Sequence, residues 1–183
     1  ALRSIISASF NKRLTVEAVM LREYPHFLHL ASEIERLKER YAEYKLPKGY
    51  LDYDDLLFFL LLLLQQEEIQ GVVSEMYRYL MVDEYQDTNR AQGDITYFLG
   101  RSHGNVMVVG DDAQSIYGFR GASHENIMEF PKRFPRTKII KLEENYRSTQ
   151  KILDVANSVL ENMVSKYAKE MRSASHEVGI LPA

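Results

Sequence analysis

The segment that decides the fold reads Leu80-Met81-Val82-Asp83-Glu84. It closes a β-rich run over residues 77–83, and residues 105–110 and 137–142 form two further short runs of this kind. Helical patterns separate these runs, over residues 88–99 and 123–134. Strands that alternate with helices at this spacing predict βαβ crossovers. The expected fold is therefore α/β with a parallel sheet.

The chain before this segment reads as helical. Apolar residues recur at helical spacing from residue 15 to 44, and Pro25 is expected to divide this stretch into two helices. After a breaker at residues 46–49, Asp52 is expected to be the N-cap of the next helix. That helix contains an apolar run over residues 56–64, about half of the roughly 20 residues needed to span a bilayer. Because the run is apolar all round, we expect it to be buried on all sides.

Composition restricts the function classes. The chain has 183 residues, 45% of them hydrophobic and 27% charged, which is enough for a folded core. It has no Cys, which excludes disulfides, thiolate metal sites and a cysteine nucleophile, and its five His show no zinc-ligand spacing. The net charge of −3 conceals a block of −8 over residues 51–100, between mildly basic blocks on either side. A cation site beside a polyanion track would produce this distribution, and so would a random scatter of surface charge.

Acidic side chains follow two of the predicted strands. Asp83 and Glu84 end the first, and Asp111 and Asp112 follow the second. Ligands of parallel α/β sheets collect at the carboxyl ends of strands. Adjacent carboxylates there suit Mg²⁺ and can act as a general base toward water, although acidic pairs are also common in solvated loops.

Three longer strings extend these acidic pairs. Residues 82–89, 109–122 and 142–149 resemble motifs II, III and IV of the UvrD/Rep/PcrA family of superfamily 1 DNA helicases. The resemblance is dense over residues 51–183, and the helices before it are similar to the family's accessory subdomain. It implies ATP and Mg²⁺ as cofactors, and single-stranded DNA and DNA duplex junctions as partners, with no membrane.

The resemblance implies a role for several residues in ATP hydrolysis. Asp83 would hold Mg²⁺ through water, and Glu84 would orient or deprotonate the water that attacks the γ-phosphate. Gln114 would link the nucleotide state to the grip on DNA. Arg147 would be the arginine finger that reaches the γ-phosphate, or else an ordinary surface ion-pair partner.

A second group is expected to bind DNA. Tyr117 and Phe119 lie two residues apart, just before Arg120, as in clusters that stack bases and contact phosphate. The alternative is that both aromatic rings belong to the core. Phe119 stands where many family members have Trp, which keeps a smaller stacking face.

The resemblance also predicts the organisation of the chain. Residues 1–50 are expected to be part of a helical accessory subdomain, residues 51–143 the C-terminal half of a RecA-like P-loop NTPase motor domain, and residues 144–183 the start of a second motor domain. The phosphate-binding pattern G-x-x-x-x-G-K-[ST] is absent from the 183 residues. Ser148 is expected to cap the helix that opens the last segment.

The implied function is part of an ATP-dependent DNA helicase that moves 3′ to 5′ on single-stranded DNA and unwinds duplex, in bacterial or archaeal cytoplasm, associated with the nucleoid. We expect this piece alone to be inactive. Two alternatives remain: the helicase subunit of a recombination helicase-nuclease, and a non-catalytic DNA-binding or interaction module that retains the motifs.

Overall fold

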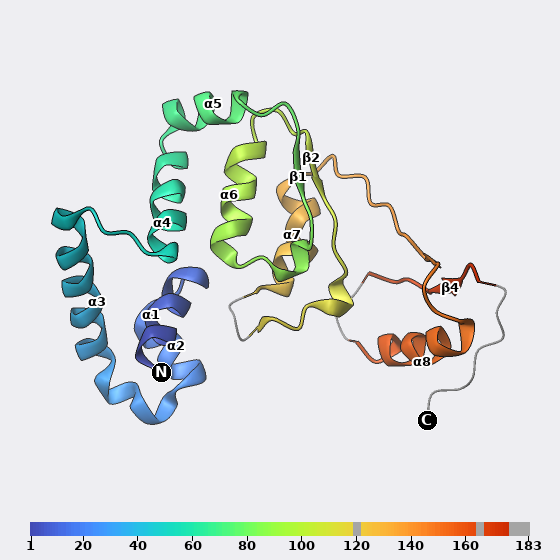
Figure 1. The fold of residues 1–183 in the computed structure, drawn as a ribbon, viewed down its shortest axis with the longest axis horizontal. Helices are drawn as coiled ribbons and strands as arrows, with labels where there is room; N and C mark the ends of the chain where they lie inside the picture. Colours follow the sequence, from blue (N-terminus) through green and yellow to red (C-terminus); the bar gives the residue numbers. More distant parts are fainter. Residues whose placement is uncertain (119–121, 164–166, 176–183) are drawn as a thin grey trace. The chain divides into compact units, whose positions relative to one another are not determined.

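The computed structural model describes residues 1–118, 122–163 and 167–175, which form two compact units (Figure 1). The first unit comprises Ala1–Phe134 and the second Pro135–Ala183.

The first unit opens with a small helical core. Its elements are α1 (Leu2–Asn11), α2 (Val16–Glu23), the 3-10 turn η1 (Pro25–Leu30) and α3 (Ala31–Lys45). The interruption predicted at Pro25 is confirmed, because proline lacks the N–H that would continue α2. Helix α1 was not predicted from the sequence, since its N-cap, Ala1, offers no side-chain hydrogen bond. The buried side chains of this core are Ile5, Val16, Val19 and Met20.

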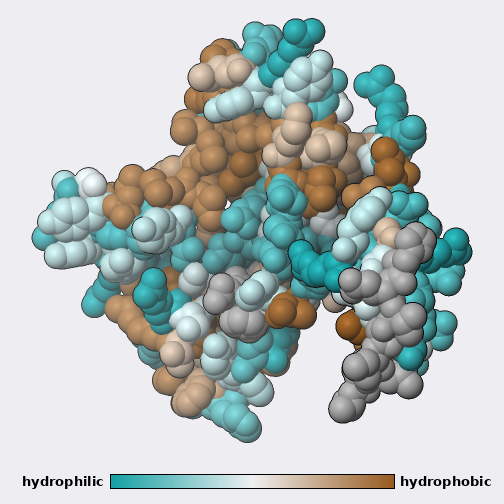
Figure 2. All heavy atoms as spheres, turned by 45° about the vertical axis from the view of Figure 1, so that its right-hand side comes forward, coloured by the Kyte–Doolittle hydropathy of each residue, from teal (hydrophilic) through white to brown (hydrophobic). Residues whose placement is uncertain are grey.

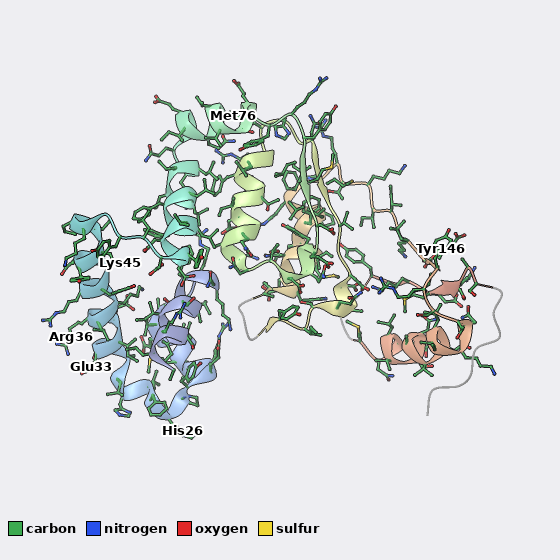
Figure 3. The ribbon with its side chains drawn as sticks, in the orientation of Figure 1. His26, Glu33, Arg36, Lys45, Met76 and Tyr146 are labelled. Carbon is green, nitrogen blue, oxygen red and sulfur yellow. The ribbon has the colours of Figure 1, made fainter. Side chains whose placement is uncertain are left out.

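Two aspartates start the next helix, α4 (Tyr53–Leu64), as a capping box. The Asp52 carboxylate accepts from Asp55 N at 3.0 Å, and the Asp55 carboxylate accepts from Asp52 N at 2.8 Å. Lys45, labelled in Figure 3 at the end of α3, donates to both carboxylates. Burial acts to lower the pKa of Lys45, but its hydrogen bonds to the two aspartates outweigh burial and raise it. The predicted N-cap is therefore confirmed, and it also joins α3 to α4.

The prediction that α4 is buried on all sides is wrong. Leu61 and Leu64 pack against Ala91 and Ile95 of α6 (Arg90–Gly100). The exposed apolar residues of α4 are Leu56, Phe58, Leu60, Leu62 and Leu63. Figure 2 shows a broad hydrophobic area in the upper part of the molecule. This is the height at which Figure 1 shows α4 and α5 (Glu67–Glu75). Among the described residues, α4 packs mainly on α6, α5 and α1, and its other side is left uncovered.

Within the described residues, no single helix is both long and apolar enough to cross a membrane. Helices α4 and α5 reach such a length only as a pair, bent by 104°.

A parallel β-α-β unit forms the rest of the first unit. Strand β1 (Leu80–Val82) leads through α6 to β2 (Val106–Val108), and the strands pair in parallel with Leu80 opposite Val106. The expected α/β class with a parallel sheet is thus confirmed at the level of a small two-stranded sheet. Helix α7 (His124–Arg133) packs on the 3-10 turn η3 (Tyr85–Asp87) that follows β1, where Phe130 meets Tyr85 edge-on with ring centroids 5.6 Å apart.

The second unit differs from expectation in two places. Residues 137–142 form no strand; instead β3 (Glu144–Asn145) pairs in parallel with β4 (Arg172–Ser173). A strand needs a neighbour for its backbone groups, and no described strand lies beside residues 137–142. The N-cap of α8 (Gln150–Glu161) is Thr149, not Ser148. The main-chain oxygen of Ser148 instead accepts from Ser173 Oγ at 2.7 Å, which ties the start of α8 to β4.

Candidate active site

The first acidic pair lies where β1 ends. Asp83 and Glu84 are both exposed, and Glu84 N donates to Asp83 Oδ1 at 2.9 Å. Glu84 adopts a left-handed backbone, with φ of 50° and ψ of 40°. This conformation costs a residue other than glycine roughly 1–2 kcal/mol. Such strain is typical of positions where a side chain must be presented in one direction.

Gln86 holds the carboxylate of Glu84, and sequence reasoning missed it. Its Nε2 donates to Glu84 Oε2 at 2.7 Å, and its Oε1 accepts from Asp111 N at 3.0 Å. Gln86 is only 2% exposed. The only sequence signal was a polar residue two positions after an acid; its partner lies 25 residues along the chain and is brought close by the parallel pairing of β1 and β2.

The second acidic pair supports the backbone after β2. Asp111 Oδ1 accepts from Ala113 N at 3.0 Å, and its Oδ2 accepts from Gln114 Nε2 at 2.8 Å. Asp112 is buried. The two strand ends are therefore brought together, but the described residues contain no cluster of three or more His, Asp or Glu side chains that could hold a metal ion.

The expected DNA-contact segment begins on the same stretch of chain. Tyr117 is 36% exposed, and its main-chain oxygen accepts from Ala122 N at 3.3 Å. Ala122 in turn forms an antiparallel bridge with Asn89, just before α6. Phe119 and Arg120 lie outside the described residues. Ala122 is thus held against Asn89 at the end of motif II, and Tyr117 is held in turn by its hydrogen bond to Ala122.

Arg147 belongs to the second unit, where it is exposed and its backbone N donates to Asn145 Oδ1 at 2.9 Å. Its expected role as an arginine finger remains a prediction.

The arrangement in the first unit can present a carboxylate to a bound molecule. Glu84 is exposed, while the group that orients its carboxylate is buried. Gln114 is exposed and lies 30 positions after Glu84 in the sequence. Its side chain hydrogen-bonds to Asp111, whose backbone N–H donates to Gln86. An exposed, oriented carboxylate suits the activation of a water molecule at a bound ligand, and Gln114 is linked to it through Asp111 and Gln86.

Comparison with known proteins identifies the family of this chain. The family described as UvrD/REP helicase N-terminal domain matches residues 2–135. "DNA helicase II" of Rickettsia typhi is 44% identical over 134 residues, which is 73% of this chain and 20% of that protein. "ATP-dependent DNA helicase Rep" of Buchnera aphidicola is 42% identical over 136 residues, 74% of this chain and 21% of that protein.

A third relative, "ATP-dependent DNA helicase PcrA" of Staphylococcus aureus, is 42% identical over 126 residues, which is 68% of this chain and 17% of that protein. The chain thus spans about a fifth of the length of the relatives it matches. The family match covers most of the first unit and includes both strand ends that form the site. The chain belongs to the UvrD/REP helicase family.

Proposed function

We propose that this chain is part of an ATP-dependent DNA helicase and carries the residues that activate the hydrolytic water. The observation that carries the proposal is the Glu84 carboxylate, presented at the end of β1 and hydrogen-bonded by Gln86. The relatives of this chain are named DNA helicase II, Rep and PcrA, and two of these names specify ATP dependence.

In the proposed reaction, Glu84 orients a water molecule and accepts its proton. The water oxygen forms a bond to the γ-phosphorus of ATP while the bond to the β-γ bridging oxygen breaks, which yields ADP and phosphate. Glu84 then returns the proton to solvent. An exposed carboxylate is suited to this exchange because it keeps contact with bulk water.

Asp83 fits the proposed Mg²⁺ role. One of its oxygens accepts from Glu84 N, and among the described residues its Oδ2 makes no hydrogen bond. An exposed carboxylate oxygen of this kind can bind a hydrated Mg²⁺ ion. When bound with ATP, Mg²⁺ would neutralise charge that develops on the phosphates.

The proposed DNA contacts lie on the segment after β2. Tyr117 and Phe119 would stack on bases, Arg120 would contact phosphate, and Gln114 would couple this contact to the nucleotide. Stacking of this kind does not depend on the base sequence, which suits translocation along single-stranded DNA from 3′ to 5′ and the opening of duplex junctions. We place this activity in the cytoplasm.

The proposed organisation follows the same family. Residues 1–50 would belong to a helical accessory subdomain, residues 51–143 to a RecA-like motor domain, and residues 144–183 to the start of a second motor domain. Arg147 would reach the γ-phosphate from that second domain.

ATP hydrolysis tests the proposal most simply. We expect the full-length protein that carries this chain to hydrolyse ATP faster when single-stranded DNA is added. The 183-residue chain should show no such activity, because its sequence lacks the Gly-rich loop that cradles the triphosphate. DNA-dependent hydrolysis by the purified 183-residue chain, abolished by Glu84→Gln, would contradict the second expectation; a full-length protein without any ATPase would contradict the first.

A single aromatic substitution tests the DNA contact. Tyr117→Ala in the full-length protein should weaken binding to single-stranded DNA by about 1–3 kcal/mol, with little dependence on base sequence. Tyr53→Ala is the matched control, because Tyr53 is an exposed tyrosine of the same unit that lies outside the proposed contact. Fluorescence anisotropy with labelled oligonucleotides measures both affinities. Equal affinities for Tyr117→Ala and wild type would remove Tyr117 from the DNA site.

A further inference from the structure

Gln86 is a buried amide between the two strand ends, and each half of it has a different partner. Its Oε1 accepts from the backbone N of Asp111, at 3.0 Å. Because a backbone N–H can only donate, this bond fixes which end of the amide is oxygen. The Nε2 donor must then face Glu84 Oε2, at 2.7 Å.

The main chain of Gln86 is held by the same segment. Ser115 Oγ donates to the Gln86 carbonyl at 3.1 Å, and Tyr85 N donates to Val109 O at 2.9 Å. Gln86 therefore contacts the stretch after β2 through both its side chain and its backbone. A buried residue anchored through both its side chain and its backbone holds the carboxylate it contacts in one orientation.

Gly110 makes room for this amide. A Cβ at Gly110 would lie 2.6 Å from Gln86 Oε1 and 3.0 Å from Ile127 Cδ1. Only a residue without a side chain lets the backbone of the Gly110–Asp111 step approach the amide this closely. The fold thus provides a fitted place for Gln86.

We infer that Gln86 is a positioning residue for hydrolysis: it locks the Glu84 carboxylate to the backbone of Asp111, and so connects the general base with the segment that carries Gln114 and Tyr117. This inference rests on the proposed function, since it requires Glu84 to act on the hydrolytic water. An exposed carboxylate without this donor would rotate among several orientations and would seldom be aligned with the water. The segment after β2 can then bias hydrolysis, because any shift of Asp111 moves the amide that orients Glu84.

The test uses the full-length protein and the substitution Gln86→Met, which keeps the packing volume and removes both hydrogen bonds. We expect kcat for DNA-stimulated ATP hydrolysis to fall about 10- to 100-fold. The affinity for a fluorescent ATP analogue and for single-stranded DNA should each stay within about threefold, because Gln86 is only 2% exposed and offers almost no surface for a ligand to contact.

Gly110→Ala gives a second, independent variant. It leaves Gln86 in place but crowds its Oε1, so it should lower kcat in the same way with ligand affinities retained. The matched control is Gln70→Met. Gln70 is another buried bridging amide of the same unit, 5% exposed, with Nε2 bonded to Phe98 O at 2.7 Å and to Ser102 Oγ at 2.8 Å. Gln70→Met should lower the melting temperature about as much as Gln86→Met does, and it should leave kcat unchanged.

A kcat defect in Gln86→Met and Gly110→Ala, with bound nucleotide and DNA retained and Gln70→Met fully active, supports the inference. Wild-type kcat in a folded Gln86→Met protein, or an equal kcat loss in Gln70→Met, would overturn it. The proposed function fails separately: in that case Glu84→Gln itself would keep hydrolysing ATP.

Discussion

Glu84→Gln in the full-length protein is expected to lower kcat for ATP hydrolysis about 10²- to 10⁴-fold, which is the usual contribution of a positioned general base. The amide keeps the shape of the side chain and can still accept a hydrogen bond from Gln86. It cannot take the proton of the attacking water. ATP binding should therefore be nearly unchanged, because Glu84 is proposed to act on the water and not on the triphosphate.

The matched control for this variant is Glu75→Gln, an exposed glutamate at the end of α5 with no proposed role. Single-turnover hydrolysis and binding of a fluorescent ATP analogue separate chemistry from affinity. If Glu84→Gln hydrolysed ATP at nearly the wild-type rate, Glu84 would not be the base. If both substitutions slowed hydrolysis equally, the effect would be one of general surface charge.

Leu64→Ala is expected to lower the free energy of unfolding of the 183-residue chain by about 2–5 kcal/mol. Leu64 is fully buried against α6, so its truncation removes apolar contacts and leaves a cavity. Leu63→Ala, one residue earlier on the same helix, should cost less than about 1 kcal/mol, because Leu63 is 46% exposed.

Urea unfolding followed by circular dichroism measures both values. Similar losses for the two variants would mean that both sides of α4 are covered in solution, contrary to the one-sided packing of α4 in the structure. A small loss for Leu64→Ala would show that the contact between α4 and α6 contributes little to the fold.

Local signals predicted the parts of the fold that depend on neighbouring residues. The helix start at Asp52 follows from its own capping box, and the break at Pro25 follows from a missing N–H. The parallel pairing of β1 and β2 was also predictable, because a crossover helix between two β-rich runs has few other solutions.

Two of the errors are local, the N-cap of α8 and the missed helix α1, and two concern long-range partners. Residues 137–142 have strand propensity, but the described chain places no strand beside them. The composition of α4 indicated burial on every side, whereas the described elements cover only part of it. Propensity and composition indicate which secondary structure and which degree of burial a segment can adopt. The neighbouring elements determine which of these forms in the folded chain.

The candidate site shows the same difference between residues that the sequence reveals and residues whose role depends on a long-range contact. The acidic residues at the strand ends were visible in the sequence because they follow apolar runs directly. Gln86 was not, since its importance depends on a contact with Asp111 that only the folded sheet creates. Both acidic pairs follow predicted strands, but in the structure Asp111 caps the turn that follows it and Asp112 is buried.

Strand separation tests the central claim most directly. The full-length protein that carries this chain should separate a labelled duplex with a 3′ single-stranded tail in the presence of ATP and Mg²⁺, faster than the same duplex with a 5′ tail. The Glu84→Gln protein should bind the tailed duplex and leave it intact. If the folded wild-type protein bound the 3′-tailed duplex and ATP but separated no strands, or if Glu84→Gln separated them equally well, the helicase account would be contradicted.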